Sequence, residues 1–250
     1  MDKLTQKSPG SNGTTLFQGL MKTIQHGGFK SHTSQENARE IMGPSFFGID
    51  DAIKHFGVSP SKREIAAFAD VPFSTKILIK HRFDHILVAV FPLSILDIRS
   101  RADSKPFFSA THFDIVESVD VRGKDVALKE QRFAKNRGKI GWHLVRKEPA
   151  PNCADLSWWW QRMFLGVNQK VPTARVLMYT IIGYHLLTGQ GLFTELPYTR
   201  CVDRRSSSRG VAISNWGEGD YIGYAPGIRF SSFSRFFSCK RLGIACQQRL

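Results

Sequence analysis

The sequence lacks a hydrophobic run long enough to span a membrane, and its few cysteines contain no Cys-x-x-Cys pair. Its longest apolar stretch falls short of the roughly 20 residues that a membrane helix needs. Without the Cys-x-x-Cys spacing, a zinc site or a thiol redox motif has no support. The start of the chain shows no signal-peptide pattern, so we expect a cytoplasmic protein with free thiols and no membrane span.

Recognisable catalytic motifs are also missing. No Gly-rich phosphate loop follows the apolar segment 85–91, and no Gly-x-Ser-x-Gly nucleophile elbow occurs. We interpret the histidines as scattered, so no metal ion or other cofactor is expected. His143 and His185 are the positions around which an enzyme pocket could form, although lone histidines are more often hydrogen-bonded core residues. No catalytic residue is predicted, and a non-enzymatic protein is favoured. An uncharacterised enzyme ranks third, after the two binding hypotheses given below.

Positive charge is abundant. The 35 lysines and arginines outnumber the 21 acidic residues, which gives a formal net charge of +14. Such a balance favours anionic partners, and nucleic acid is a possible one. The alternative is an ordinary solvated basic surface. With 42% hydrophobic residues, the chain is predicted to fold around a sizeable core.

The pattern predicts a mixed α+β protein with a helical N-terminal layer and a small sheet. Turn-rich residues 1–33 are expected to form a flexible tail. Residues 34–196 are predicted to form an α/β core domain. From about residue 197 glycine, serine, arginine and aromatic residues alternate in short segments, which predicts a β-rich C-terminal subdomain over 197–250.

The segment 172–187 is predicted to be the central helix. Pro172 suits a first helical turn, and Thr188-Gly189 supplies a stop. Apolar side chains fall nearly all round its helical wheel, which is typical of a helix buried in a core. The other elements are therefore expected to pack around it.

Two strands and several helices are predicted before this helix. The continuous apolar run 85–91 indicates a central strand covered on both faces. Segment 140–146 alternates, with Trp142 and Leu144 on one face. Ser34 is a plausible N-cap, and helices are expected over 50–56 and from Ser59-Pro60, as cap and first turn, to Ala69. Together these last two helices could form a DNA-binding helix-turn-helix, but with only two basic residues in the second, a helical hairpin packed on the core is favoured.

Three consecutive tryptophans, Trp158, Trp159 and Trp160, are predicted to lie on a helix capped by Ser157. They cover about 200° of the helical wheel, so at least one cannot face the core. The two interpretations are a single exposed tryptophan and an aromatic patch for a partner.

The C-terminal part carries the predicted recognition surface. Aromatic residues give contact area at low entropic cost, and serine and glycine adapt to a ligand. Interleaved arginines would equally suit single-stranded nucleic acid. The remaining alternative is a β-rich subdomain whose aromatic residues fill a small core. The predicted ligand-binding residues are Trp216, Tyr221, Tyr224, Arg229, Phe233 and Arg235.

Two resemblances accompany these patterns. The segments 85–99 and 171–184 resemble stretches in a group of bacterial hypothetical proteins, over about residues 34–202, which implies no particular activity. The end of the chain, from Arg229 through Leu242-Gly243-Ile244-Ala245-Cys246, is similar to the C-type-lectin-like ends of retroelement-diversified variable proteins. That resemblance implies a ligand surface between Trp216 and Lys240. We therefore expect a non-enzymatic protein that recognises a protein or other macromolecular ligand at its C-terminal surface, with nucleic-acid binding as the alternative.

Overall fold

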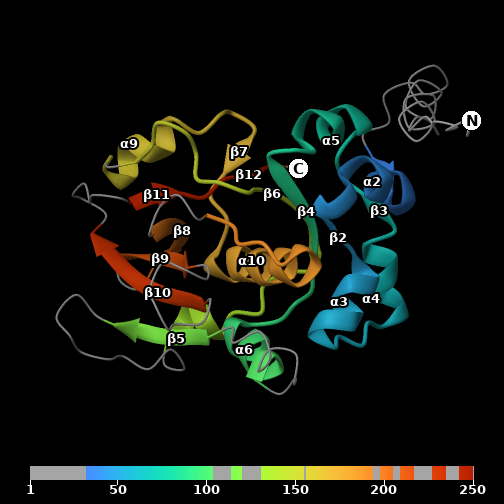
Figure 1. Ribbon diagram of the computed structural model, residues 1–250, viewed down its shortest axis with the longest axis horizontal. Helices are drawn as coiled ribbons and strands as arrows, with labels where there is room; N and C mark the ends of the chain where they lie inside the picture. The colour runs from blue at the N-terminus through green and yellow to red at the C-terminus, as the bar shows by residue number, and fades with distance from the viewer. Residues whose placement is uncertain are drawn as a thin grey trace, which may run out of the picture.

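The computed structural model describes residues 32–103, 114–119, 131–154, 156–193, 198–204, 209–216, 227–234 and 242–249. The fold is mixed α+β, as predicted. Two five-stranded sheets and a two-stranded ribbon are described, and one long helix lies between the two larger sheets (Figure 1). The predicted tail, apart from residues 32 and 33, lies outside the described residues.

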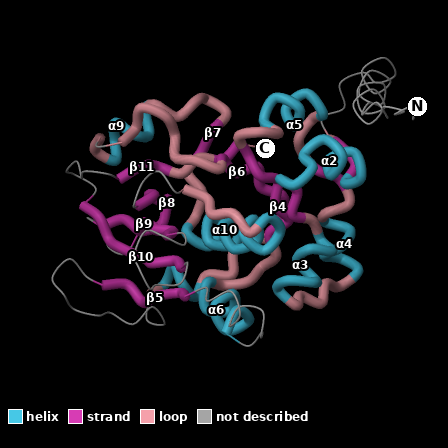
Figure 2. The backbone as a smooth tube through the Cα atoms, in the orientation of Figure 1, coloured by secondary structure: helices cyan, strands magenta, loops and turns pink. Residues whose placement is uncertain are grey.

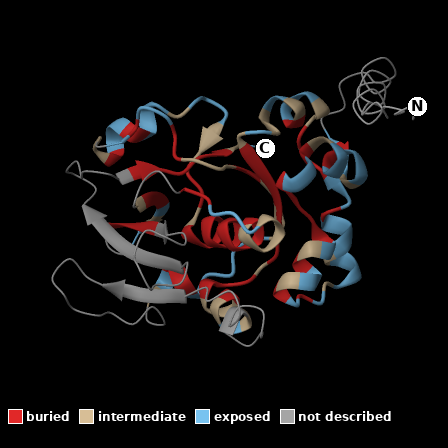
Figure 3. Ribbon diagram, viewed as in Figure 1, coloured by how far each residue is buried: buried red, intermediate tan, exposed pale blue. Residues whose placement is uncertain are grey.

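The helix α10 (Ala174–Thr188) forms the centre of the protein. It begins where the side chain of Thr173 accepts a hydrogen bond from the Val176 amide at 3.2 Å. It ends at Gly189, whose left-handed φ of 71° forms the C-cap. Every residue from 174 to 184 is buried (Figure 3). The predicted buried helix is therefore confirmed. A helix with apolar side chains on every face is most stable where neighbouring elements cover all of its faces.

The first large sheet lies on one side of α10 and has the strand order β2-β4-β6-β12-β7. All residues of β4 are buried, which confirms the predicted central strand. In β6, Trp142 and Leu144 are buried as the alternation predicted. The strands are β2 (Phe46–Phe47), β4 (His85–Val90), β6 (Gly141–Arg146), β12 (Gln247–Gln248) and β7 (Gln169–Lys170).

The second large sheet has the order β11-β8-β9-β10-β5 and lies on the other side of α10 (Figure 2). Cys201 of β8 and Val211 and Ile213 of β9 belong to the same hydrophobic cluster as α10. The C-terminal strands are thus divided between the two sheets, since β12 pairs with β6 and β7. The strands are β11 (Leu242–Ile244), β8 (Tyr198–Arg204), β9 (Arg209–Trp216), β10 (Gly227–Ser234) and β5 (Asp114–Val119).

Short helices form the predicted N-terminal layer beside β2 and β4. Ser34 and Ser74 cap α2 and α5, and Ser61 forms a reciprocal capping box with Glu64 at α4. These caps satisfy backbone amides that have no partner within the helix. The elements are α2 (Gln35–Met42), the 3-10 turn η1 (Gly43–Ser45), α3 (Ile49–Phe56), α4 (Lys62–Ala67) and α5 (Thr75–His81), with the ribbon of β1 (Thr33–Ser34) and β3 (Asp70–Val71).

Three further helices complete the described fold: α6 (Ile95–Asp103), α8 (Arg132–Lys135) and α9 (Trp158–Met163). Within α3, Ala52 and Phe56 are buried in the core, whereas α4 has no fully buried residue and ends before residue 69. Among the helices that the structure describes, none combines the length and apolarity needed to span a membrane.

Candidate functional site

A cleft of about 880 Å³ opens where the two sheets approach the N-terminal end of α10. Its walls come from β6, β7 and β12 of the first sheet, the end of β8 of the second, and the loop before α10. Sites of this size commonly hold small-molecule ligands or part of a larger one. The cleft is therefore the main candidate for ligand binding in the described part of the protein.

The residues that line the cleft are strongly cationic. One carboxylate, that of Asp203, stands among six basic side chains. Positive groups gathered in a concave surface concentrate their field on whatever enters it. The arrangement therefore selects for an anionic ligand. The basic residues are Lys139, Arg162, Lys170, Arg175, Arg204 and Arg249.

Four of these cations are exposed and reach the cleft from separate elements. Arg162 lies on α9, with its guanidinium 5.9 Å from the ring of Trp158. Arg204 ends β8, and Lys139 precedes β6. Arg249 follows β12 and is fixed by a 2.7 Å hydrogen bond from its amide to the Asn168 carbonyl. Exposed cations on a fixed frame can meet an anion without first losing a buried partner.

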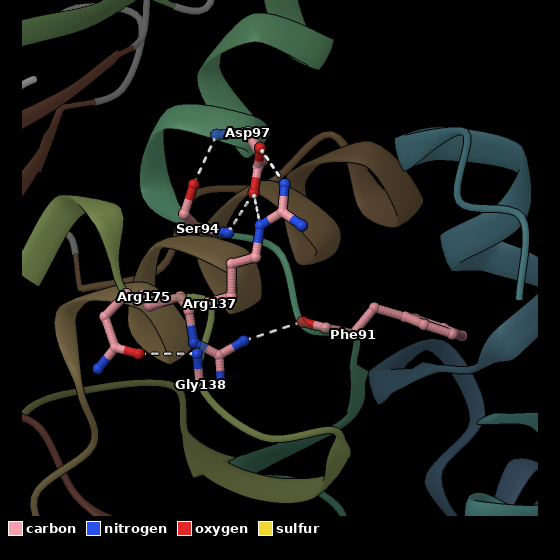
Figure 4. A network of polar contacts seen from close by, with 7 residues as sticks. Phe91, Ser94, Asp97, Arg137, Gly138 and Arg175 are labelled. Atoms are coloured by element: carbon pink, nitrogen blue, oxygen red, sulfur yellow. Dashed lines mark hydrogen bonds and ion pairs between the residues drawn. The ribbon is translucent and has the colours of Figure 1, made fainter. Parts of the chain in front are cut away.

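Arg175 is buried and has a structural role at the floor of the cleft. Its Nη1 donates to the Phe91 carbonyl at 2.9 Å, as Figure 4 shows, and its Nη2 donates to the Lys139 carbonyl at 3.2 Å. Burial lowers the pKa of the Arg175 guanidinium. The ordinary pKa of arginine is so high that the group nevertheless remains charged. These bonds connect α10 to the end of β4 and to the segment before β6.

An ion pair holds that segment against α6. Arg137 Nε lies 3.0 Å from the Asp97 carboxylate, and the same carboxylate accepts a hydrogen bond from the Ser94 amide (Figure 4). The next residue, Gly138, adopts a left-handed φ of 59°. The loop that carries Lys139 into the cleft is therefore fixed from two sides.

Asp203 already has a partner at the N-terminus of α10. Its carboxylate accepts a hydrogen bond from the Ala174 amide. Burial raises the pKa of Asp203, although this hydrogen bond opposes the rise. The helix terminus is thus satisfied by the protein itself, and the anion-binding capacity of the cleft depends on its side chains.

His143 lies in the cleft, whereas His185 lies on α10 away from it. His143 Nδ1 is 2.8 Å from Gln247 Oε1, and burial lowers the pKa of the imidazole to about 4. The ring is therefore neutral near pH 7. Among the described residues lining the cleft there is no serine, cysteine or glutamate.

Aromatic side chains are exposed beside the cleft on α9. Trp158 is only 5% exposed, whereas Trp159 and Trp160 are 65% and 59% exposed. Met163 and Phe164 are exposed as well. We call this group of four side chains, Trp159, Trp160, Met163 and Phe164, the outer face of α9. The exposure agrees with the aromatic-patch interpretation, because two tryptophans rather than one remain open to solvent.

The ligand-binding residues predicted from the sequence lie largely beyond what the structure describes. By backbone register Trp216 pairs with Gly227, Arg229 with Ser214, and Phe233 with Gly210, all within β9 and β10. Their side chains, and all of Tyr221, Tyr224 and Arg235, lie outside the described residues. The C-terminal recognition surface therefore stays a prediction.

The structure also assembles a group that sequence interpretation missed. The ligand atoms of His81, Asp84 and His85 lie within 4.8 Å of one another. Interpreting the histidines as scattered was wrong, because His81 and His85 have the His-x-x-x-His spacing. This spacing was the available signal, whereas nothing in the sequence indicated the cleft.

Comparison of the chain with protein-family models, curated proteins and solved structures finds no match. Both resemblances noted in the sequence therefore remain predictions.

Proposed function

We propose that the protein binds single-stranded nucleic acid, with the phosphates held in the cationic cleft. The observation that carries this proposal is the composition of the cleft, where six basic side chains surround one carboxylate that is already hydrogen-bonded. The net charge of +14 also favours association with a polyanion such as nucleic acid. The cleft takes a ligand of small-molecule dimensions, so a short stretch of one strand would enter it rather than a duplex.

The outer face of α9 supports a single strand as the ligand. Proteins that bind single strands combine a positive groove with aromatic side chains on which bases stack. Arg162 of α9 lines the cleft, as do Leu165 and Val167 beyond its end, and the exposed Trp159 and Trp160 lie on α9. A strand that leaves the cleft across α9 would find stacking partners there.

The proposal is tested by fluorescence anisotropy with a labelled single strand of about a dozen nucleotides. Affinity should fall steeply with salt, and the Arg204→Ala and Arg249→Ala variants should bind more weakly, each reducing the log–log salt slope by about 0.7. Replacing Trp159 and Trp160 together by alanine should weaken binding with the salt slope unchanged, because stacking releases no counterions.

Arg63→Ala is the matched control for charge. Arg63 is also exposed but lies on α4, outside the cleft. Its removal should leave the affinity and the slope close to those of the unmodified protein. No binding at low salt would refute the proposal. An equal loss on removing Arg63 and Arg204 would also refute it, and would favour the α3–α4 pair or a diffuse basic surface.

The C-terminal surface predicted from the sequence is a separate proposal, of a protein or other macromolecular ligand bound at residues 216–235. A Tyr221→Ala and Tyr224→Ala double variant tests this surface. If that variant loses ligand binding while the Arg204 and Arg249 variants keep it, the C-terminal surface is favoured over the cleft as the binding site.

A further inference from the structure

A compact group of three metal-ligand side chains stands at the junction of α5 and β4. His81 is the last residue of α5, and His85 is the first residue of β4. Asp84 Oδ1 lies 2.9 Å from His85 Nδ1 and 3.4 Å from His81 Nδ1. The two imidazole rings pack edge to face, with their centroids 4.3 Å apart and an angle of 61° between their planes. Three potential ligand atoms thus point towards one another from one short segment.

These separations suit a transition-metal ion. Zinc binds imidazole nitrogen and carboxylate oxygen at about 2.0–2.2 Å, so neighbouring ligands of a tetrahedral ion stand about 3.3 Å apart. The two distances from Asp84 Oδ1 lie on either side of this value. Two histidines and one carboxylate form a ligand set that zinc and related ions use, with a fourth position left for water.

His81 supplies an independent observation. Its Nδ1 atom is shielded from solvent and makes no hydrogen bond within the described residues. Buried polar atoms nearly always have a partner. A metal ion bound at this nitrogen would satisfy it, whereas the 3.4 Å contact with Asp84 does not.

The protonation states of the group also suit a metal. Burial lowers the pKa of His81, and that of His85 to about 4, so both rings are neutral near pH 7. Although burial opposes it, the hydrogen bond with His85 holds the pKa of Asp84 below its usual value. Neutral imidazole and ionised carboxylate are the forms that coordinate metals. The nearby cations of Lys80 and Arg146 oppose a bound cation and would weaken the site.

We propose that His81 Nδ1, Asp84 Oδ1 and His85 Nδ1 form a binding site for Zn²⁺ or a similar transition-metal ion. On binding, the neutral His85 ring changes tautomer: Nδ1 gives up its proton to solvent, Nε2 takes one up from solvent, and no net proton is released. Gln248, whose amide nitrogen lies 3.4 Å from that Nε2, would turn its amide so that the oxygen accepts from it. The ion would then fasten the end of α5 to β4, with β12 as the outer support.

The test uses the full chain without a histidine tag, stripped with EDTA and titrated with Zn²⁺ against a chromophoric chelator. The unmodified chain should bind about one ion, and Co²⁺ should give the visible absorption of a four-coordinate site. His81→Gln and Asp84→Asn should each weaken binding about tenfold or more. These residues are chosen because His85 is fully buried and its replacement could prevent folding.

His32→Gln is the matched control, because His32 is exposed and stands outside the group. It should bind Zn²⁺ as the unmodified chain does. Circular dichroism in EDTA should show all variants folded. Absence of binding to the unmodified chain would overturn the proposal. Equal affinity in the His81, Asp84 and His32 variants would also overturn it, because the ion would then be held elsewhere.

Discussion

Gly138 and Arg175 lie so close together that no side chain has room at position 138. A Cβ atom added to Gly138 would stand 2.5 Å from Nη2 of the Arg175 guanidinium. That guanidinium cannot move away freely, because it donates to the carbonyls of Phe91 and Lys139. The contact fixes the loop that leads into the cleft.

The Gly138→Ala variant should lose about 2–4 kcal/mol of unfolding free energy, from the strain of a left-handed residue plus the collision with Arg175. Gly189→Ala is the control, since Gly189 has a φ of 71° but nothing within 4 Å of an added Cβ. It should lose only the strain, about 1–2 kcal/mol. Urea unfolding measures both, and equal losses would show that the contact with Arg175 costs nothing.

Replacing Arg175 by lysine should destabilise the protein although the charge is kept. An ammonium group cannot make the two divergent hydrogen bonds of the buried guanidinium, so about 2–4 kcal/mol should be lost. Arg137→Lys serves as the comparison, because Arg137 is largely exposed and its ion pair with Asp97 is worth at most about 1 kcal/mol. Similar unfolding midpoints for the two variants would contradict the structural role of Arg175.

Stability should fall between pH 6.5 and pH 4. The pKa values of His85 and His143 are lowered to about 4 in the folded protein, whereas an unfolded histidine titrates near 6.5. The unfolded chain therefore takes up protons first as the pH falls, and each histidine contributes a loss of about 3 kcal/mol across this window. Above pH 6.5 the histidines are neutral in both the folded and the unfolded chain, so none of this stability is lost.

Urea unfolding at pH 7.5 and pH 5, in EDTA to exclude metals, measures this effect. In the His143→Gln variant, whose amide can still donate to Gln247, the difference between the two pH values should be about half as large. An unchanged difference would show that His143 titrates normally in the folded protein.

The three tryptophans of α9 should respond differently to replacement by alanine. Trp158 is buried, so its loss should cost about 3–5 kcal/mol. Trp159 and Trp160 are exposed, so each replacement should change stability by about 0.5 kcal/mol or less. Thermal unfolding compares the three variants directly. A large loss at Trp159 would show that the outer face of α9 is covered.

Local patterns predicted the elements of the fold because each depends on neighbouring residues. The buried helix expected over 172–187 is observed as Ala174–Thr188, and the strand expected over 85–91 as His85–Val90. The cap at Ser34 is also where the sequence indicated, whereas the cap expected at Ser59 is observed at Ser61. Short strands such as β12 gave no signal, since two residues have no periodicity and pair only through the completed sheet.

The cleft could not be predicted because its residues are brought together by tertiary structure. Lys139, Arg204 and Arg249 come from separate segments, and each looks like an ordinary surface cation in the sequence. The group at His81 and His85 differs, because the two histidines are four residues apart in the sequence and this spacing was visible. Only the fold shows that the two histidines meet at the junction between α5 and β4.

The two sheets contribute opposite walls of the cleft, β6, β7 and β12 on one side and β8 on the other. A ligand bound there would contact both sheets and connect them. Amide hydrogen exchange in β8 and β6 should then slow together on ligand addition, because opening either sheet would first require release of the ligand. Occupancy would thereby also be reported by amides of β6 and β8 that do not line the cleft.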